Sequence, residues 1–117
     1  MTKRIMFRHM DHSQPMQEHA DKHLAKIERF LEHEPSPVHI DLVMEPSKTR
    51  EHHRIELIVK SPSYDLVVHH EYTGENFYAA LDKIIDTMYY QLHEHKRKKI
   101  EVERHQAQEF KKETRSE

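Results

Sequence analysis

Residues 76–99, NFYAALDKIIDTMYYQLHEHKRKK, decide how the chain folds. Apolar side chains recur there every three or four residues, the spacing that places them on one side of an α-helix. We therefore predict a helix over this stretch, with a buried stripe made of Phe77, Leu81, Ile84, Met88, Leu92 and His95. The other side is polar, and the run Lys96-Arg97-Lys98-Lys99 places four cations near the negative end of the helix dipole.

A second amphipathic helix is predicted from about Pro15 to His33, after the turn and capping residues that precede Pro15. Its apolar stripe comprises Met16, Ala20, Leu24, Ile27 and Leu31. Its exposed flank carries Lys22, Lys26 and Arg29. The sequence Pro35-Ser36-Pro37 ends this helix, because proline cannot continue the helical hydrogen-bond pattern.

Four strands are predicted from residues that alternate between apolar and polar. A short first strand contains Ile5 and Phe7. The inward residues are Val38, Ile40, Leu42 and Met44 in the second strand, Ile55, Leu57 and Val59 in the third, and Leu66, Val68, His70 and Tyr72 in the fourth. Polar residues 46–53 and the single glycine, Gly74, mark connections. The order β-α-β-β-β-α predicts an α+β two-layer sandwich, in which both helices cover one face of a four-stranded sheet.

Composition limits the class of protein. A chain of 117 residues, with 35% hydrophobic and 34% charged residues, is long enough for one domain with a thin core. The absence of cysteine excludes disulfides, and no apolar run resembles a signal peptide or a membrane span, so we expect a cytoplasmic protein. We predict one domain over residues 1–100 and a charged, frayed or disordered tail over residues 101–117.

Two segments are familiar: HADKHLAKIERF (19–30) and the helix of residues 76–99 resemble the ribosome hibernation-promoting factor family, a sigma-54 modulation protein family that includes the ribosome-associated inhibitor. The resemblance covers roughly residues 3–100, and LAKIERF (24–30) and YAALDKIID (78–86) are its most specific pieces. It implies a domain similar in shape to double-stranded RNA-binding domains. The resemblance further implies that this domain lodges on the small ribosomal subunit, excludes messenger and transfer RNA, and inhibits translation under stress or slow growth.

The resemblance also implies contacts with 16S ribosomal RNA through basic side chains, which match Lys26, Lys96 and Lys98. Helical geometry adds five further cations, namely Lys22, Arg29, Lys83, Arg97 and Lys99. Two positions that the family usually fills with Lys and Arg are Thr87 and Tyr90 here, so the face is partly neutral. We include Tyr90 among the RNA-binding residues, because a tyrosine can stack on a base or bond to a phosphate.

Within this resemblance the chain looks like a short form. Within the resemblance we expect no second domain like that of the long, dimer-forming members. The resemblance places the tail closer to the inhibitor type, in which the tail occludes the site of a partner that pairs ribosomes. Single inactive ribosomes and ribosome dimers both stay open as outcomes. We expect a monomer that binds the small subunit and the whole ribosome, with no cofactor, small-molecule substrate or membrane partner.

The residues also bear on two other classes of function. The alternative is a histidine-rich metal-binding protein, a zinc buffer or chaperone, because His19 and His23 stand at i and i+4 among thirteen histidines. A zinc site needs a third ligand, and no Glu next to His19 completes a metalloprotease helix motif, so no metal ligands are assigned. An enzyme is not expected, since the chain lacks cysteine and a glycine-rich loop, and Asp82 and Asp86 are typical of a solvated helix face.

Overall fold

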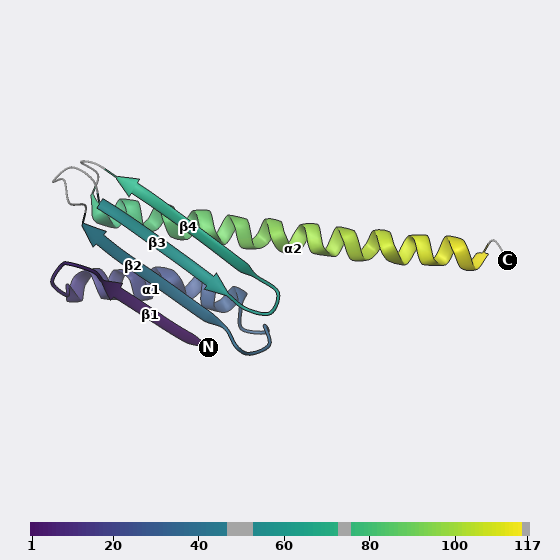
Figure 1. Ribbon diagram of the computed structural model, residues 1–117, viewed down its shortest axis with the longest axis horizontal. Helices are drawn as coiled ribbons and strands as arrows, with labels where there is room; N and C mark the ends of the chain where they lie inside the picture. Colours follow the sequence, from purple (N-terminus) through teal and green to yellow (C-terminus); the bar gives the residue numbers. More distant parts are fainter. Residues whose placement is uncertain (47–52, 73–75, 116–117) are drawn as a thin grey trace.

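The computed structural model describes residues 1–46, 53–72 and 76–115, and confirms the predicted order of elements (Figure 1). The elements are β1 (Thr2–Phe7), α1 (Gln14–Phe30), β2 (His39–Pro46), β3 (His53–Lys60), β4 (Asp65–Tyr72) and α2 (Phe77–Arg115). Most of the predicted connection before β3, together with Gly74 and residues 116–117, lies outside the described residues.

The four strands form one sheet in the order β1-β2-β3-β4. Strand β1 runs parallel to β2, as the crossover through α1 requires, and the two remaining pairs are antiparallel hairpins. The register sets Leu42 opposite both Ile5 and Leu57. Because paired residues point to the same face of a sheet, the apolar sets of neighbouring strands meet on one side.

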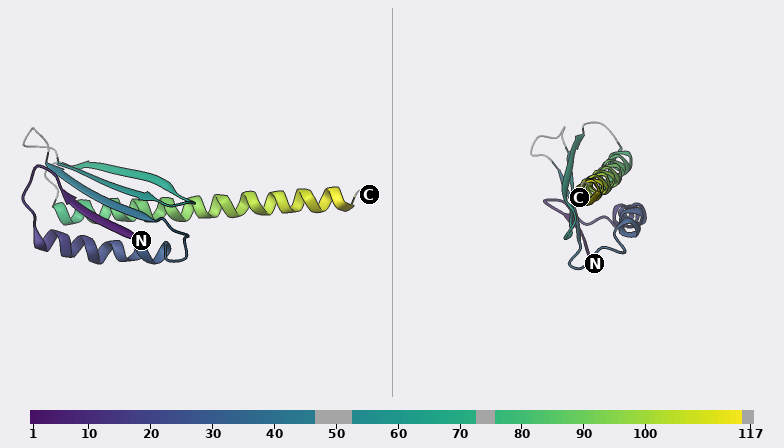
Figure 2. Two further views of the ribbon diagram at one scale, coloured as in Figure 1. Left: turned by 60° about the horizontal axis from the view of Figure 1, so that its bottom comes forward. Right: turned by 90° about the vertical axis from the view of Figure 1, so that its right-hand side faces the viewer.

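Both helices cover that apolar face (Figure 2), which confirms the two-layer α+β prediction. The core between the layers is fully buried at most positions, including Leu24, Ile27, Ile40, Leu42, Ile55, Leu57, Leu81 and Ile84. The outer face of the sheet is largely polar, where Arg4 Nε lies 3.0 Å from Asp41 Oδ1 and Arg54 pairs with Glu56. Apolar burial holds the layer of helices on the sheet, and Lys3 of β1 adds ion pairs to Asp21 and Glu28 of α1 at 3.0 and 2.7 Å.

Helix α1 begins and ends close to the predicted positions. Ser13 is the N-cap residue, and its Oγ accepts a hydrogen bond from the Met16 amide at 3.5 Å. The helix ends at Phe30, three residues before the predicted His33, while Leu31 still packs into the core with 1% of its surface exposed.

Helix α2 differs from the prediction in two respects. It continues to Arg115, although we expected frayed or disordered chain after residue 100. The segment is rich in Glu, Lys, Arg and Gln, which favour helix, and Arg97 Nη1 bonds to Glu101 Oε1 at 2.7 Å across one turn. The predicted burial of His95 is wrong, because this side chain is exposed. Among the side chains of α2 that the structure describes, Leu92 is the last buried one, and the helix then runs past the sheet (Figure 1).

The projecting part of α2 gives the molecule an elongated shape of 69 × 26 × 19 Å. Its radius of gyration is 18.6 Å, compared with roughly 13 Å for a compact domain of this length. Side chains 101–107 are all exposed, so this part of the helix contributes no core.

Candidate nucleic-acid interface

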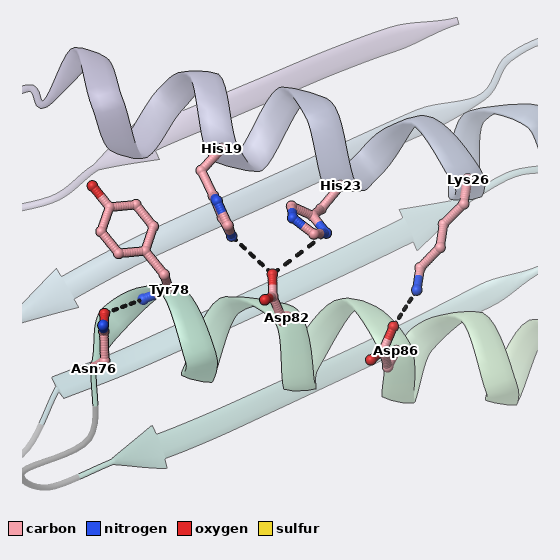
Figure 3. Close-up of polar contacts among 7 residues, drawn as sticks. All are labelled: His19, His23, Lys26, Asn76, Tyr78, Asp82 and Asp86. Atoms are coloured by element: carbon pink, nitrogen blue, oxygen red, sulfur yellow. Dashed lines mark hydrogen bonds and ion pairs between the residues drawn. The ribbon is translucent and has the colours of Figure 1, made fainter.

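The two helices lie side by side on the same face of the sheet, and their outward sides form one surface (Figure 2). On α1, Lys22 and Arg29 are exposed, whereas Lys26 is half-buried and points toward α2. Its ammonium group forms an ion pair with Asp86 (Figure 3). The same group lies 5.1 Å from the centre of the Tyr89 ring. Lys26 is therefore oriented by α2 and is not a free solvated cation.

An aromatic cluster connects the two helices next to Lys26. The His93 ring centroid lies 4.8 Å from that of Phe30 and 4.5 Å from that of Tyr89, both in edge-to-face geometry. From α2, Lys96 Nζ reaches back to 5.6 Å from the centre of the Phe30 ring. Phe30 and Tyr89 were not predicted as surface residues, although the i, i+4 spacing of Tyr89 and His93 indicates that these two share one helix face.

These side chains line two shallow hollows that share His93. The first is bounded by Lys26, Arg29, Phe30, Tyr89 and His93. The second continues along α2 and is bounded by His93, Lys96, Arg97, Ile100, Glu101 and Arg104. Cations and aromatic rings thus alternate over a continuous surface, the combination that binds phosphates and stacks on bases.

The four consecutive cations at residues 96–99 do not form one patch. Successive residues of a helix are turned by roughly 100°, and the four side chains point in different directions. Lys96 faces α1, whereas Lys99 Nζ lies 3.5 Å from Ser63 Oγ in the turn between β3 and β4. Lys98 is exposed. The structure therefore brings only Lys96 of this run to the helix pair near Lys26.

Arg97 is held by acids of its own helix. Its guanidinium contacts Glu101 at 2.7 Å and Glu94 at 3.0 Å. The hydrogen bond to Glu94, followed by the charges of Glu101 and Glu94, raises the pKa of Arg97, and the hydrogen bond from Arg97 lowers the pKa of Glu94. Because two acids of the same helix contact Arg97, its charge is the most strongly compensated in the run.

The two positions that depart from the family pattern differ in availability. Thr87 Oγ1 donates a hydrogen bond to the Lys83 carbonyl at 2.8 Å, so its hydroxyl is turned toward its own helix. Tyr90 is 65% exposed and is free to present its ring to a partner. Lys83 is exposed on the same helix.

A separate cluster lies nearer the start of α2. Asp82 approaches His19 and His23 of α1, and these three residues form the only group of three or more potential metal ligands within residues 1–46, 53–72 and 76–115. The third ligand that the sequence did not reveal thus comes from the other helix, 59 residues beyond His23 in the chain.

None of the helices in the described parts of the chain combines the length and the hydrophobicity needed to cross a lipid bilayer. Residues 4–100 match the model of the Sigma 54 modulation protein / S30EA ribosomal protein family, and the chain belongs to that family. The resemblance found in the sequence is thereby confirmed, and this membership marks a ribosome-associated protein that is not an enzyme.

Two solved structures share the fold. The N-terminal domain of Thermus thermophilus Protein Y is 20% identical, covers 76% of this chain and 91% of its own, and has a TM-score of 0.60. A ribosomal subunit interface protein from Coxiella burnetii is 17% identical, covers 82% of this chain and 98% of its own, and has a TM-score of 0.63. A search of curated proteins gave no match.

Proposed function

We propose that this protein is a ribosome hibernation factor that binds the small subunit and sterically blocks messenger and transfer RNA. The contact is made by the helix-pair surface, which we define as the outward sides of α1 and α2. Its members are the predicted residues Lys22, Lys26, Arg29, Lys83, Tyr90 and Lys96, together with Phe30, Tyr89 and His93. Arg97, Lys98 and Lys99 were also predicted, and we propose them as secondary RNA contacts farther along α2, because only Lys96 of this run faces the helix pair. The observation that carries the proposal is the convergence of Lys26 and Lys96 from opposite helices on one aromatic cluster.

Local charge has to drive this binding, because the chain as a whole carries a formal net charge of −2. Each phosphate that a cation neutralises releases counterions and adds about 0.7 to 0.9 to the salt slope of the binding constant. Phe30, Tyr89 and Tyr90 supply stacking that does not depend on salt. Affinity should therefore fall steeply with salt toward a residual level set by stacking.

Co-sedimentation with purified small subunits over a salt series tests the surface. Lys26→Gln and Lys96→Gln should each lower the salt slope by about 0.7 to 0.9. Lys60→Gln is the matched control, since Lys60 is exposed at the end of β3 and belongs to neither helix. Equal slopes for all three variants would place the contact elsewhere on the molecule.

Occlusion is tested separately by adding messenger and transfer RNA as competitors. Both should displace the protein in proportion to their own affinity, and the protein should inhibit translation of a reporter message in a purified system. If binding is tight and salt-sensitive but neither RNA competes with it, the proposal of ribosome binding stands and the proposal of steric blocking is refuted.

We further propose that the protein acts in the cytoplasm as a monomer and binds whole ribosomes as well as small subunits. Residues 101–117 act as a separate functional segment in this proposal, although helix α2 is continuous through Arg115, and sucrose gradients of ribosomes measure the effect of the segment. The gradients are run with a pairing partner present. If the segment resembles the inhibitor type, we expect single ribosomes with the full chain and paired ribosomes after the segment is removed.

A further inference from the structure

The cluster of His19, His23 and Asp82 has the geometry of a small metal site (Figure 3). His19 Nε2 lies 2.8 Å from Asp82 Oδ1, and His23 Nδ1 lies 3.4 Å from the same oxygen. The two imidazole rings are 4.2 Å apart between centroids, one helical turn along α1. One donor atom from each of the three residues lies within 4.8 Å of the others.

We propose that these three side chains bind one Zn²⁺ ion that bridges α1 and α2. Two imidazole nitrogens and one carboxylate oxygen form a donor set that suits zinc, and a water molecule would complete a tetrahedral site. Bonds of about 2.0 to 2.1 Å separate tetrahedral donors by roughly 3.3 Å. The donor atoms already lie within 4.8 Å of one another, so rotations of the three side chains bring them to this spacing without a shift of either helix. The bonds to zinc then replace the present contacts between the imidazoles and Asp82.

The backbone beneath the cluster is fixed by the core. Ala20 and Leu24 flank the two histidines on α1, Leu81 precedes Asp82 on α2, and all three are 0% exposed. The edge of the Tyr78 ring packs on His19 with centroids 4.8 Å apart, which limits how that imidazole can turn. The donors are thus held together before metal arrives, and little ordering entropy opposes binding.

Exposure and charge also permit a cation here. The side chains of His19, His23 and Asp82 are 25%, 36% and 41% exposed, so the cluster is covered on the side of the core and open to solvent on the other. With neutral imidazoles its formal charge is −1, which Zn²⁺ changes to +1. Lys22 and Lys83 are exposed neighbours that oppose the ion at a distance, while the charge of Lys26 is offset by Asp86.

The competing interpretation is that Asp82 only accepts hydrogen bonds from the two imidazoles, as carboxylates do throughout proteins without metal. The two interpretations differ in their response to zinc. Zinc binding by the isolated protein requires no ribosome and is therefore independent of the proposed function.

Calorimetric titration of Zn²⁺ into chelator-treated full chain tests the site. We expect one saturable equivalent in the wild type and none in His19→Ala/His23→Ala. The matched control is His33→Ala/His95→Ala, which removes the same number of imidazoles from exposed positions and should keep the equivalent. This control is needed because thirteen histidines give any such chain weak, unspecific zinc binding.

Asp82→Asn provides the sharper variant, since it retains the shape of the side chain and removes only the anionic donor. It should weaken zinc binding at least about tenfold, a loss observed even when an outer-shell partner of a metal ligand is removed. Circular dichroism confirms that each variant is folded, and Co²⁺ absorption in the visible range reports the coordination geometry. Equal titrations for the site and control variants, or only non-saturating binding in the wild type, would overturn the zinc site.

Discussion

The ion pair between Lys26 and Asp86 occupies the helix-pair surface and has to loosen if Lys26 contacts a phosphate. Replacing Asp86 with asparagine releases Lys26 and removes an acid that repels RNA, so both effects strengthen binding. The side chains are 34% and 66% exposed, which makes this a surface pair with a free energy of about 0.2 to 1 kcal/mol. At 1.4 kcal/mol per factor of ten, Asp86→Asn should raise the affinity for small subunits up to about fivefold.

Co-sedimentation at low and physiological salt measures this change, with Asp65→Asn on the exposed end of β4 as the control for removing one acid. The gain should shrink when Asp86→Asn is combined with Lys26→Gln, because the two residues then act through one contact. The free energy of unfolding should fall by no more than about 1 kcal/mol. Unchanged or weaker binding of Asp86→Asn would show that the pair positions Lys26 instead of competing with phosphate, and would refute the reasoning.

Three further results are expected. Leu24→Ala, at a fully buried position, should lower the free energy of unfolding in urea by about 2.7 to 5 kcal/mol. Desolvation raises the pKa of Glu34, but hydrogen bonds from the Ser61–Ser63 turn and the charge of Lys99 outweigh it and hold this pKa below its ordinary value. Its contribution to stability is therefore present above about pH 4.3 and lost as pH falls through the lower folded-state pKa, so Glu34→Gln should flatten the acid limb of a stability–pH curve. Removal of residues 101–117 should lower helical circular dichroism and leave the melting temperature nearly unchanged, because side chains 101–107 are exposed.

Hydrophobic periodicity predicted the sheet and the packing of both helices because it reports burial directly. Ile40 and Leu42 of β2, and Leu24 of α1, are fully buried as their spacing indicated. The same periodicity failed at His95, since it continues along a helix regardless of whether a sheet still lies beneath it. It also missed Ala80 and Ile85, which are buried beside the predicted stripe where α2 meets both the sheet and α1.

The candidate sites depended on information that a linear pattern does not contain. Lys26 was predicted as a surface cation, but its partner Asp86 stands 60 residues away, and only the relative rotation of the two helices brings them together. The same holds for Asp82 beside His19. Spacing along one helix identifies which residues share a face, whereas contacts between faces follow from how the core sets the two helices against each other.

Helix α2 has no break between the part that packs on the sheet and its end at Arg115. A helix rises about 1.5 Å and turns roughly 100° per residue, so residues 101–115 extend about 22 Å in a direction and with a rotation already set by Leu81 and Met88 in the core. When the body formed by the sheet and the packed helices docks on a partner, the orientation of residues 101–115 is thus fixed as well. Inserting or deleting a single residue near position 100 would rotate every side chain beyond it by roughly 100° and change the length of this segment by only about 1.5 Å. The docked body would be unchanged. The direction in which these side chains point can therefore change almost independently of how far the segment extends.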